Sequence, residues 1–246
     1  MFKLFFIIIQ LQAIVLTQDI DTLFDLANES YIKKNFLESS KTYELILKEG
    51  YHSTDLYMNL GNSYYFLEEF GNSRWSYEMG MKLSPFDKDL IYNYDKLIKS
   101  VTNVIEPPKN NLLDFIKIFL QSFSLNMFVF STVCFFFIFS FLTFLYKILK
   151  VNFIKVVSYI LLSLLVVNIL LVFTKKVWDQ NNKFVIVIKD ETSIFSAPYL
   201  NNSIQSSTLY DGNKVKVNQE TNLWLEISTF DGRKGWIRTE DIRNLD

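Results

Sequence analysis

The sequence has very few of the residues that build metal, redox and nucleophilic sites. Among its 246 residues are one cysteine, Cys134, and one histidine, His52. A single cysteine excludes an intrachain disulfide and any site held by several cysteines. The chain also shows no glycine-rich phosphate loop, metal-ligand spacing or serine nucleophile motif. We therefore expect no cofactor and no enzyme activity, although a hydrolase that uses carboxylates alone stays open.

Glycine and proline are also scarce, with seven and four residues, whereas half of the residues are hydrophobic and 24 are Phe. Such a chain is too apolar for one ordinary soluble domain, so part of it is expected to face lipid. The 25 Lys and Arg residues nearly balance the 26 Asp and Glu residues. This balance gives no overall positive field, and we expect no nucleic-acid partner.

Residues 1–18 have the layout of a secretory signal, with Lys3, an apolar stretch to Leu16 and then polar residues. The apolar stretch is too short to span a bilayer comfortably, which favours a signal peptide. An uncleaved anchor is the alternative. In both cases the residues that follow are exported.

A shift of 34 residues aligns the first part of the chain with itself. The matched pairs are Leu26 with Leu60, Ala27 with Gly61, Asn28 with Asn62, Tyr31 with Tyr65, Phe36 with Phe70, Ser39 with Ser73 and Tyr43 with Tyr77. The residue types resemble the tetratricopeptide (TPR) family of all-α solenoids, in which small residues let paired helices approach closely. The resemblance is fullest in Tyr57, Leu60, Gly61, Tyr64, Ser73, Tyr77, Gly80 and Pro85. We expect a TPR module over residues 19–103, with repeats at about 20–53 and 54–87 and a capping helix at 87–101.

One face of the first helix in each repeat is not needed for packing and forms a candidate partner groove. Its residues are Phe24, Asn28, Tyr31, Met58, Asn62, Tyr65, Tyr92 and Lys96. Asparagine can hydrogen-bond a peptide backbone, and tyrosine offers stiff, amphipathic contact area. The alternative is that this face only packs between helices, while Asp21, Asp55 and Asp89 cap the helix starts.

Two charge-free apolar runs predict transmembrane helices at residues 123–146 and 156–174. The preceding residues 104–122 are expected to form a linker and a helix lying in the headgroup region. Residues 147–155 contain three lysines and no acid, which places this connection in the cytoplasm. Together with the signal, this predicts a bacterial inner-membrane protein with both flanking domains on the periplasmic side.

Polar side chains inside the first predicted span could mark a helix–helix seam. They are Ser131, Thr132, Ser140 and Thr143. Cys134 in the same span is expected to be a small apolar filler with no chemistry of its own.

Short strands with period-two alternation predict a small all-β barrel over residues 183–246. The motifs Tyr210-Asp211-Gly212 and Gly235-Trp236-Ile237, with Trp224 between them, resemble bacterial SH3 domains. Some domains of this kind bind cell-wall peptides, and an aromatic shelf of Phe195, Tyr210 and Phe230 with Trp224 is the candidate surface. The alternative is that the aromatic residues serve the core, where we expect Trp224, Ile227 and Trp236.

The complete order of segments predicts a multidomain membrane protein and resembles the BatE family, the TPR-bearing products of bacterial aerotolerance (Bat) operons. The likeness is closest at residues 46–51 and 55–65. It implies an inner-membrane scaffold or adaptor that works with other Bat proteins, including von Willebrand A-domain members, in stress or oxygen tolerance. Two alternatives remain, a cell-wall-binding sensor acting through the SH3-like domain and a membrane-tethered chaperone for envelope proteins.

Overall fold

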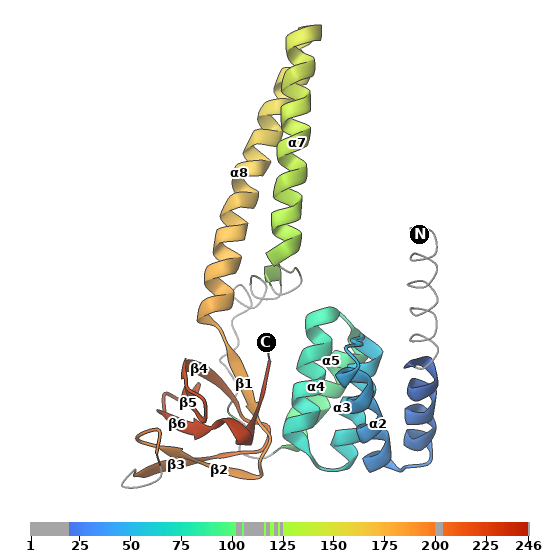
Figure 1. Cartoon of the computed structure of the whole chain (residues 1–246), viewed down its shortest axis with the longest axis vertical. Coiled ribbons are helices and arrows are strands. Elements are labelled where there is room, and N and C mark those ends of the chain that lie inside the picture. Colours follow the sequence, from blue (N-terminus) through green and yellow to red (C-terminus); the bar gives the residue numbers. More distant parts are fainter. Residues whose placement is uncertain are drawn as a thin grey trace, which may run out of the picture. The chain divides into compact units, whose positions relative to one another are not determined.

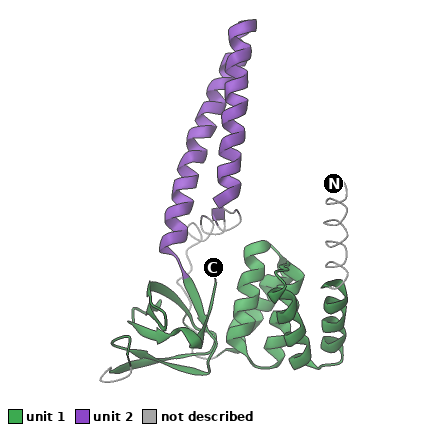
Figure 2. Cartoon of the chain, in the orientation of Figure 1, with its two compact units in different colours: residues 1–108, 184–246 green, residues 109–183 purple. Residues whose placement is uncertain are grey.

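A computed structural model describes residues 20–101, 105, 116, 119–120, 123, 125–199 and 204–245. The predicted signal at residues 1–18 and most of the predicted linker at 104–122 lie outside the described residues. The chain divides into two compact units, coloured separately in Figure 2. One unit comprises Met1–Pro108 together with Phe184–Asp246, and the other comprises Lys109–Lys183. The two regions that flank the apolar helices therefore belong to a single compact unit.

Five short helices form the N-terminal part of the first unit (Figure 1). Residues 20–32 are helical, and α2 (Phe36–Lys48), α3 (Thr54–Phe66), α4 (Phe70–Leu83) and α5 (Lys88–Ser100) follow, each of these packing against the next. We call residues 20–101 the helical module. Its repeat-like helical character confirms the coarse prediction from the 34-residue shift.

Side chains cap two helices of the module at their N-termini. At the start of α3 the Ser53 hydroxyl accepts from the Leu56 N–H at 3.2 Å, and at the start of α5 the Asp87 carboxylate accepts from the Asp89 N–H at 3.0 Å. The prediction that Asp55 and Asp89 are the caps is wrong, because both lie inside the first helical turn. There their negative charge still favours the positive end of the helix dipole.

Small residues bring neighbouring helices close together, as the repeat pattern predicts. A Cβ atom on Gly61 of α3 would lie 2.5 Å from the ring of Tyr77 in α4. Ser73 of α4 donates its hydroxyl to the Gly61 carbonyl at 2.8 Å. Because the Tyr77 side chain is only 1% exposed, it has little room to move aside. The close approach of the two helices therefore requires glycine at position 61.

The second unit contains two long apolar helices, α7 (Leu125–Leu149) and α8 (Asn152–Asn181), which pack against each other. Both are long and apolar enough to cross a membrane, with mean hydropathies of 2.4 and 2.7. The helices run beyond the predicted spans of 123–146 and 156–174. Between them only Lys150 and Val151 are not helical, so most of the predicted connection at 147–155 extends the two helices.

A polar clamp joins α7 and α8 within their apolar surfaces. The Asn168 side chain on α8 accepts from the Thr132 hydroxyl at 2.6 Å and donates to the Ser131 hydroxyl at 3.0 Å. Ser131 and Thr132 thus lie at the predicted helix–helix seam. Ser140 and Thr143 instead donate to carbonyls of their own helix at 2.8 Å. In a lipid environment the clamp satisfies polar groups that would otherwise meet hydrocarbon.

The C-terminal region forms one antiparallel sheet of seven strands. The strands are β1 (Phe184–Val187), β2 (Glu191–Phe195), β3 (Gln205–Tyr210), β4 (Lys214–Glu220), β5 (Trp224–Ser228), β6 (Lys234–Arg238) and β7 (Ile242–Asn244), with a 3₁₀ turn η1 (Thr239–Asp241) before β7. Their spatial order is β3-β2-β6-β5-β4-β1-β7. This arrangement confirms the predicted all-β character of the region.

The predicted barrel is not closed, because the edge strands β3 and β7 do not pair with each other. On the β7 edge the Asn244 carbonyl accepts a hydrogen bond from the Trp75 indole N–H of α4 at 2.6 Å. The helical module thus satisfies a backbone group that closure would have paired within the sheet. The prediction of a complete barrel was wrong because it treated the β region as a separate domain.

Strand β1 is buried on both of its faces. Val185 and Val187 pack into the core of the sheet, whereas Ile186 packs into the core of the helical module. All three side chains are at most 2% exposed. A strand with two buried faces needs a continuous apolar run. This explains why residues 184–188 are all apolar where a half-exposed strand would alternate.

Candidate functional site

A buried group of charges joins the helical module to the sheet. The Arg74 side chain of α4 is 1% exposed and donates to the Glu78 carboxylate at 3.0 Å and to the Gly212 carbonyl at 2.8 Å. The Lys214 ammonium at the start of β4 forms a second ion pair with Glu78. Arg74 also donates to the Tyr94 hydroxyl of α5 at 3.1 Å. Helix α4 therefore carries its charges toward the sheet rather than toward solvent.

The two cations determine the charge state of Glu78. Burial by itself raises the pKa of this carboxyl, but Lys214 and Arg74 outweigh burial and hold the pKa at about 2. Glu78 is therefore ionised at neutral pH. With both partners in place the buried charges are compensated, whereas loss of one cation would leave a buried carboxylate poorly paired.

An aromatic ring and an arginine make a second contact between the helical module and the sheet. The Arg243 guanidinium of β7 lies 3.4 Å from the centre of the Trp75 ring. The same guanidinium donates to the Glu44 carboxylate of α2 at 2.7 Å, and the Tyr64 hydroxyl donates to that carboxylate at 2.9 Å. Stacking and a charge-assisted hydrogen bond act together here. The contact ties β7 to three helices of the module.

The turn between β3 and β4 closes the interface at the start of α4. The Asp211 carboxylate accepts from the Gly71 N–H at 2.9 Å. Burial raises the pKa of Asp211 to about 6, and this effect exceeds the opposing backbone hydrogen bonds. A Cβ atom on Gly71 would overlap the Val187 carbonyl, so glycine at this position lets strand and helix approach each other.

None of these residues was predicted from the sequence to lie in an interface between the helices and the sheet. The available signal was Arg74 and Glu78 four residues apart in a helix, a spacing that usually indicates an exposed ion pair. Trp75 and Arg243 carry no repeat or strand periodicity that links them. Contacts across about 170 residues of sequence depend on tertiary packing, which a local pattern does not encode.

A repeated set of asparagines lies where the candidate groove was predicted. The Asn28 side-chain oxygen accepts from the Tyr43 hydroxyl at 2.5 Å and from the Asn59 amide at 3.2 Å. One repeat later, Asn62 accepts from the Tyr77 hydroxyl at 2.7 Å and from the Asn93 amide at 3.1 Å. We call Asn28, Asn59, Asn62 and Asn93 the asparagine ladder.

The tyrosines of the ladder act as fixed donors. Burial raises the pKa of Tyr43 to about 12, and burial also raises the pKa of Tyr77. Both phenols are therefore protonated at neutral pH and donate to Asn28 and Asn62. Each tyrosine thus fixes the orientation of one asparagine, with its oxygen directed inward. Packing between helices, the alternative to a partner groove, therefore accounts for the side-chain oxygens of Asn28 and Asn62.

The remaining polar groups of the ladder are not explained by packing. Among the described residues, no hydrogen-bond partner is found for the amide nitrogens of Asn28 and Asn62 or for the side-chain oxygens of Asn59 and Asn93. None of these four atoms is fully buried, so solvent reaches them. Each asparagine pair therefore offers one donor and one acceptor, which matches the N–H and C=O groups of a peptide backbone.

The other predicted groove residues lie around the ladder. Tyr31 packs edge-on against Phe66, and Tyr65 receives the Lys96 ammonium 4.9 Å from its ring centre. Phe24 packs edge-on against Tyr43, Met58 is half-buried near Tyr77 and Leu90, and Tyr92 is 69% exposed. Of these predicted groove residues, Tyr65 and Lys96 therefore make a cation–π contact, whereas Tyr92 is open to solvent.

The structure does not join Phe195 and Phe230 of the predicted SH3-like surface in one aromatic cluster. Phe195 packs edge-on against Trp224, whereas Phe230 stacks on Phe184 at the helical side. Tyr210 is half-buried at the end of β3. Trp224 and Ile227 are buried as expected, but Trp236 is only half-buried, because it lies on the outer face of β6 opposite Phe195 and Glu226.

The residues with metal or nucleophile chemistry are dispersed. The His52 ring contacts the Tyr57 hydroxyl at 2.9 Å at an exposed position, and Cys134 is half-buried in α7. Within the described part of the chain, no group of three His, Cys, Asp or Glu side chains is arranged to hold a metal ion.

Comparison of the chain with protein-family models and with curated proteins gives no match. The resemblance to the TPR, SH3 and BatE families therefore rests on the residues quoted above.

Proposed function

We propose that the chain is a membrane-anchored scaffold that binds extended peptide segments of partner proteins along the asparagine ladder. The supporting observation is the repetition of one donor and one acceptor at Asn28–Asn59 and again at Asn62–Asn93. An extended backbone presents N–H and C=O groups at regular intervals and can pair with both. Tyr92 and Lys96 would add contacts with partner side chains.

The proposal includes the membrane arrangement expected from the sequence. Two crossings by α7 and α8 return the chain to its starting side, which agrees with the helical module and the sheet forming one compact unit. The N-terminal signal and the lysines at 147, 150 and 155 favour the periplasmic side for that unit. As the BatE resemblance implies, the partners would be other inner-membrane proteins of a stress or aerotolerance complex, including von Willebrand A-domain members.

The finer fold assignments also belong to this proposal. The helical module is interpreted as a two-repeat TPR array with a capping helix, and the open sheet as an SH3-like domain. In this interpretation the sheet serves as a cap, because its β1 face covers the core of the helical module. The scaffold would thus present the ladder on a rigid support.

The ladder can be tested by a variant that preserves its internal hydrogen bonds. Asn28→Asp together with Asn62→Asp retains the oxygens that accept from Tyr43 and Tyr77, but removes the outward amide donors. Alanine would be less suitable, because it leaves two tyrosine hydroxyls unpaired. A control that adds the same charge is Asn35→Asp with Asn181→Asp, since both positions are exposed.

The full-length proteins would be purified from their native membrane in mild detergent, and co-purifying proteins quantified by mass spectrometry. We expect wild type and control to recover the same membrane partners and the ladder variant to lose them. Equal recovery by all three proteins would indicate that the partners bind to the apolar helices or the sheet and not to the asparagine ladder. Loss in both variants would indicate a charge effect and would remove the support for a ladder site.

A further inference from the structure

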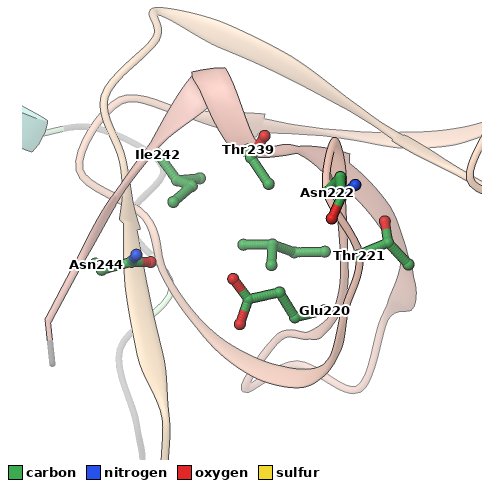
Figure 3. A pocket seen from close by; sticks show the side chains of 7 residues that line it. Glu220, Thr221, Asn222, Thr239, Ile242 and Asn244 are labelled. Carbon is green, nitrogen blue, oxygen red and sulfur yellow. The ribbon is translucent and has the colours of Figure 1, made fainter.

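A hollow of about 540 Å³ opens at one end of the sheet, between the β4–β5 hairpin and the segment from η1 to β7 (Figure 3). Seven residues line it, namely Glu220, Thr221, Asn222, Leu225, Thr239, Ile242 and Asn244. Its volume lies within the roughly 300–1,000 Å³ of typical small-ligand sites. The hollow is distinct from the asparagine ladder, since none of its residues belongs to the helical module.

The floor of the hollow is aliphatic. Leu225 belongs to the core of the sheet and is 2% exposed, and Ile242 packs against the same core. Both side chains are held by the strands from which they project. Because Leu225 has almost no exposed surface, the half-buried Ile242 side chain offers most of the apolar contact on which a hydrocarbon chain can lie.

The rim of the hollow is polar and carries one charge. The Glu220 carboxylate is directed into the hollow, and Asn222 and Asn244 line it from other sides (Figure 3). Among the described residues, none of these three side chains has a hydrogen-bond partner. The Thr221 hydroxyl, in contrast, is used internally, because it donates to the Trp224 carbonyl at 2.9 Å. Three side chains from separate elements thus present unused acceptors above an apolar floor.

This chemistry excludes several ligand classes. No lysine, arginine or histidine lines the hollow, so no positive charge would offset the repulsion between Glu220 and a phosphate or carboxylate. No aromatic ring lines it, so sugars and nucleobases lack a stacking surface. A cation on an aliphatic stem suits both the unpaired carboxylate and the aliphatic floor.

We propose that this hollow binds a lysine side chain of a peptide, with its ammonium group at Glu220 and its methylene stem on Leu225 and Ile242. An ammonium has three donors in a tetrahedral arrangement, so it can pair with Glu220 and still offer donors to other polar groups of the rim. A guanidinium is planar and gains most from bidentate carboxylates and aromatic stacking, and the hollow supplies only one carboxylate and no ring. The site therefore selects lysine over arginine.

The proposal can be tested on the full-length protein in lipid nanodiscs by ligand-observed NMR. The probe is Nα-acetyl-lysine N-methylamide, compared with the norleucine analogue, which has the same stem without the ammonium, and with the arginine analogue. We expect binding of the lysine probe, with Glu220→Gln weakening it about fivefold to tenfold, because the charge-assisted hydrogen bond is lost. The matched control Glu191→Gln removes an exposed strand carboxylate outside the hollow and should leave binding unchanged.

Equal binding of the lysine and norleucine probes, or equal affinity of wild type and Glu220→Gln, would overturn the proposal. So would tighter binding of the arginine probe. A lysine peptide made only of L-residues and one with alternating L- and D-residues then distinguish the two sources of such a side chain. Preference for the first assigns the site to a partner protein, and preference for the second to a cell-wall peptide. These readouts do not involve the asparagine ladder, so either proposal can fail without the other.

Discussion

Replacement of Arg74 by methionine should separate the helical module from the sheet. Methionine preserves much of the side-chain length but removes the donors to Glu78, the Gly212 carbonyl and the Tyr94 hydroxyl. Glu78 would keep only Lys214 as a cation. Removing one partner of a buried ion pair costs about 3–5 kcal/mol, because the other charge stays buried with poor compensation. At about 1.4 kcal/mol per tenfold change, the open fraction of the interface should rise at least 100-fold.

The chain contains a matched control with the same spacing on the surface. Lys33 and Glu29 also form an ion pair four residues apart, at 2.6 Å, but their side chains are 61% and 60% exposed. Lys33→Met should cost only about 0.3–0.5 kcal/mol, because solvent already stabilises both charges. The two substitutions thus remove ion pairs of the same spacing that differ in burial, and Arg74→Met also removes the hydrogen bonds to Gly212 and Tyr94.

Hydrogen–deuterium exchange of the full-length protein in nanodiscs measures this difference. In Arg74→Met, amides of α4 and β1 should exchange much faster than in wild type, while amides of α7 and α8 keep their protection. Lys33→Met should resemble wild type throughout. If α4 and β1 stay as protected in Arg74→Met as in Lys33→Met, the buried charges do not hold the two parts together and the reasoning is refuted.

Three further perturbations follow from the same contacts. Burial raises the pKa of Asp211 from 3.8 to about 6. Between these two pH values the folded state binds a proton that the unfolded state releases, so the interface should gain stability as the pH falls from about 6 toward 3.8. Asp211→Asn should abolish the difference between urea unfolding curves recorded at about pH 7.5 and about pH 5.5; a variant that keeps it contradicts the assignment. Gly71→Ala should expose β1 to limited proteolysis, because its Cβ would overlap the Val187 carbonyl, and an unchanged cleavage pattern would argue against this close packing. Asn168→Leu should weaken pairing of α7 and α8 by about 0.6 kcal/mol, as measured by disulfide cross-linking between Cys134 of α7 and a cysteine introduced in α8. Equal cross-linking would show that the clamp is dispensable.

The helical repeat and the apolar helices were predictable because their signals are local. The need for small residues at Gly61 and Ser73 follows from the 34-residue shift, since each repeat buries the same positions, and the structure places both at the contact between α3 and α4. Long charge-free runs likewise indicate α7 and α8 without reference to the rest of the chain. Four of the seven strands, β1, β4, β5 and β6, were predictable from short runs of strand-forming residues and from turns at Asp211-Gly212 and Asp231-Gly232, whereas β2, β3 and β7 were not predicted.

The candidate ligand groups were only partly predictable. The positions of Asn28 and Asn62 on one helix face follow from periodicity, but their partners Asn59 and Asn93 were not selected, because they lie beside that face in the repeat. The rim of the hollow was missed entirely. Glu220, Asn222 and Asn244 are polar residues of turns and strand ends, which by sequence are indistinguishable from ordinary solvated positions.

The sequence by itself determined which segments are helical, apolar or extended, because helix and strand periodicities act over a few neighbouring residues. Only the tertiary structure decided that the sheet stays open and that its β7 edge and β1 face pack on the helical module. The physical reason is that Arg74, Trp75 and Asp211 are polar or amphipathic, and whether such side chains face water or pair in a buried interface depends on partners more than 130 residues away.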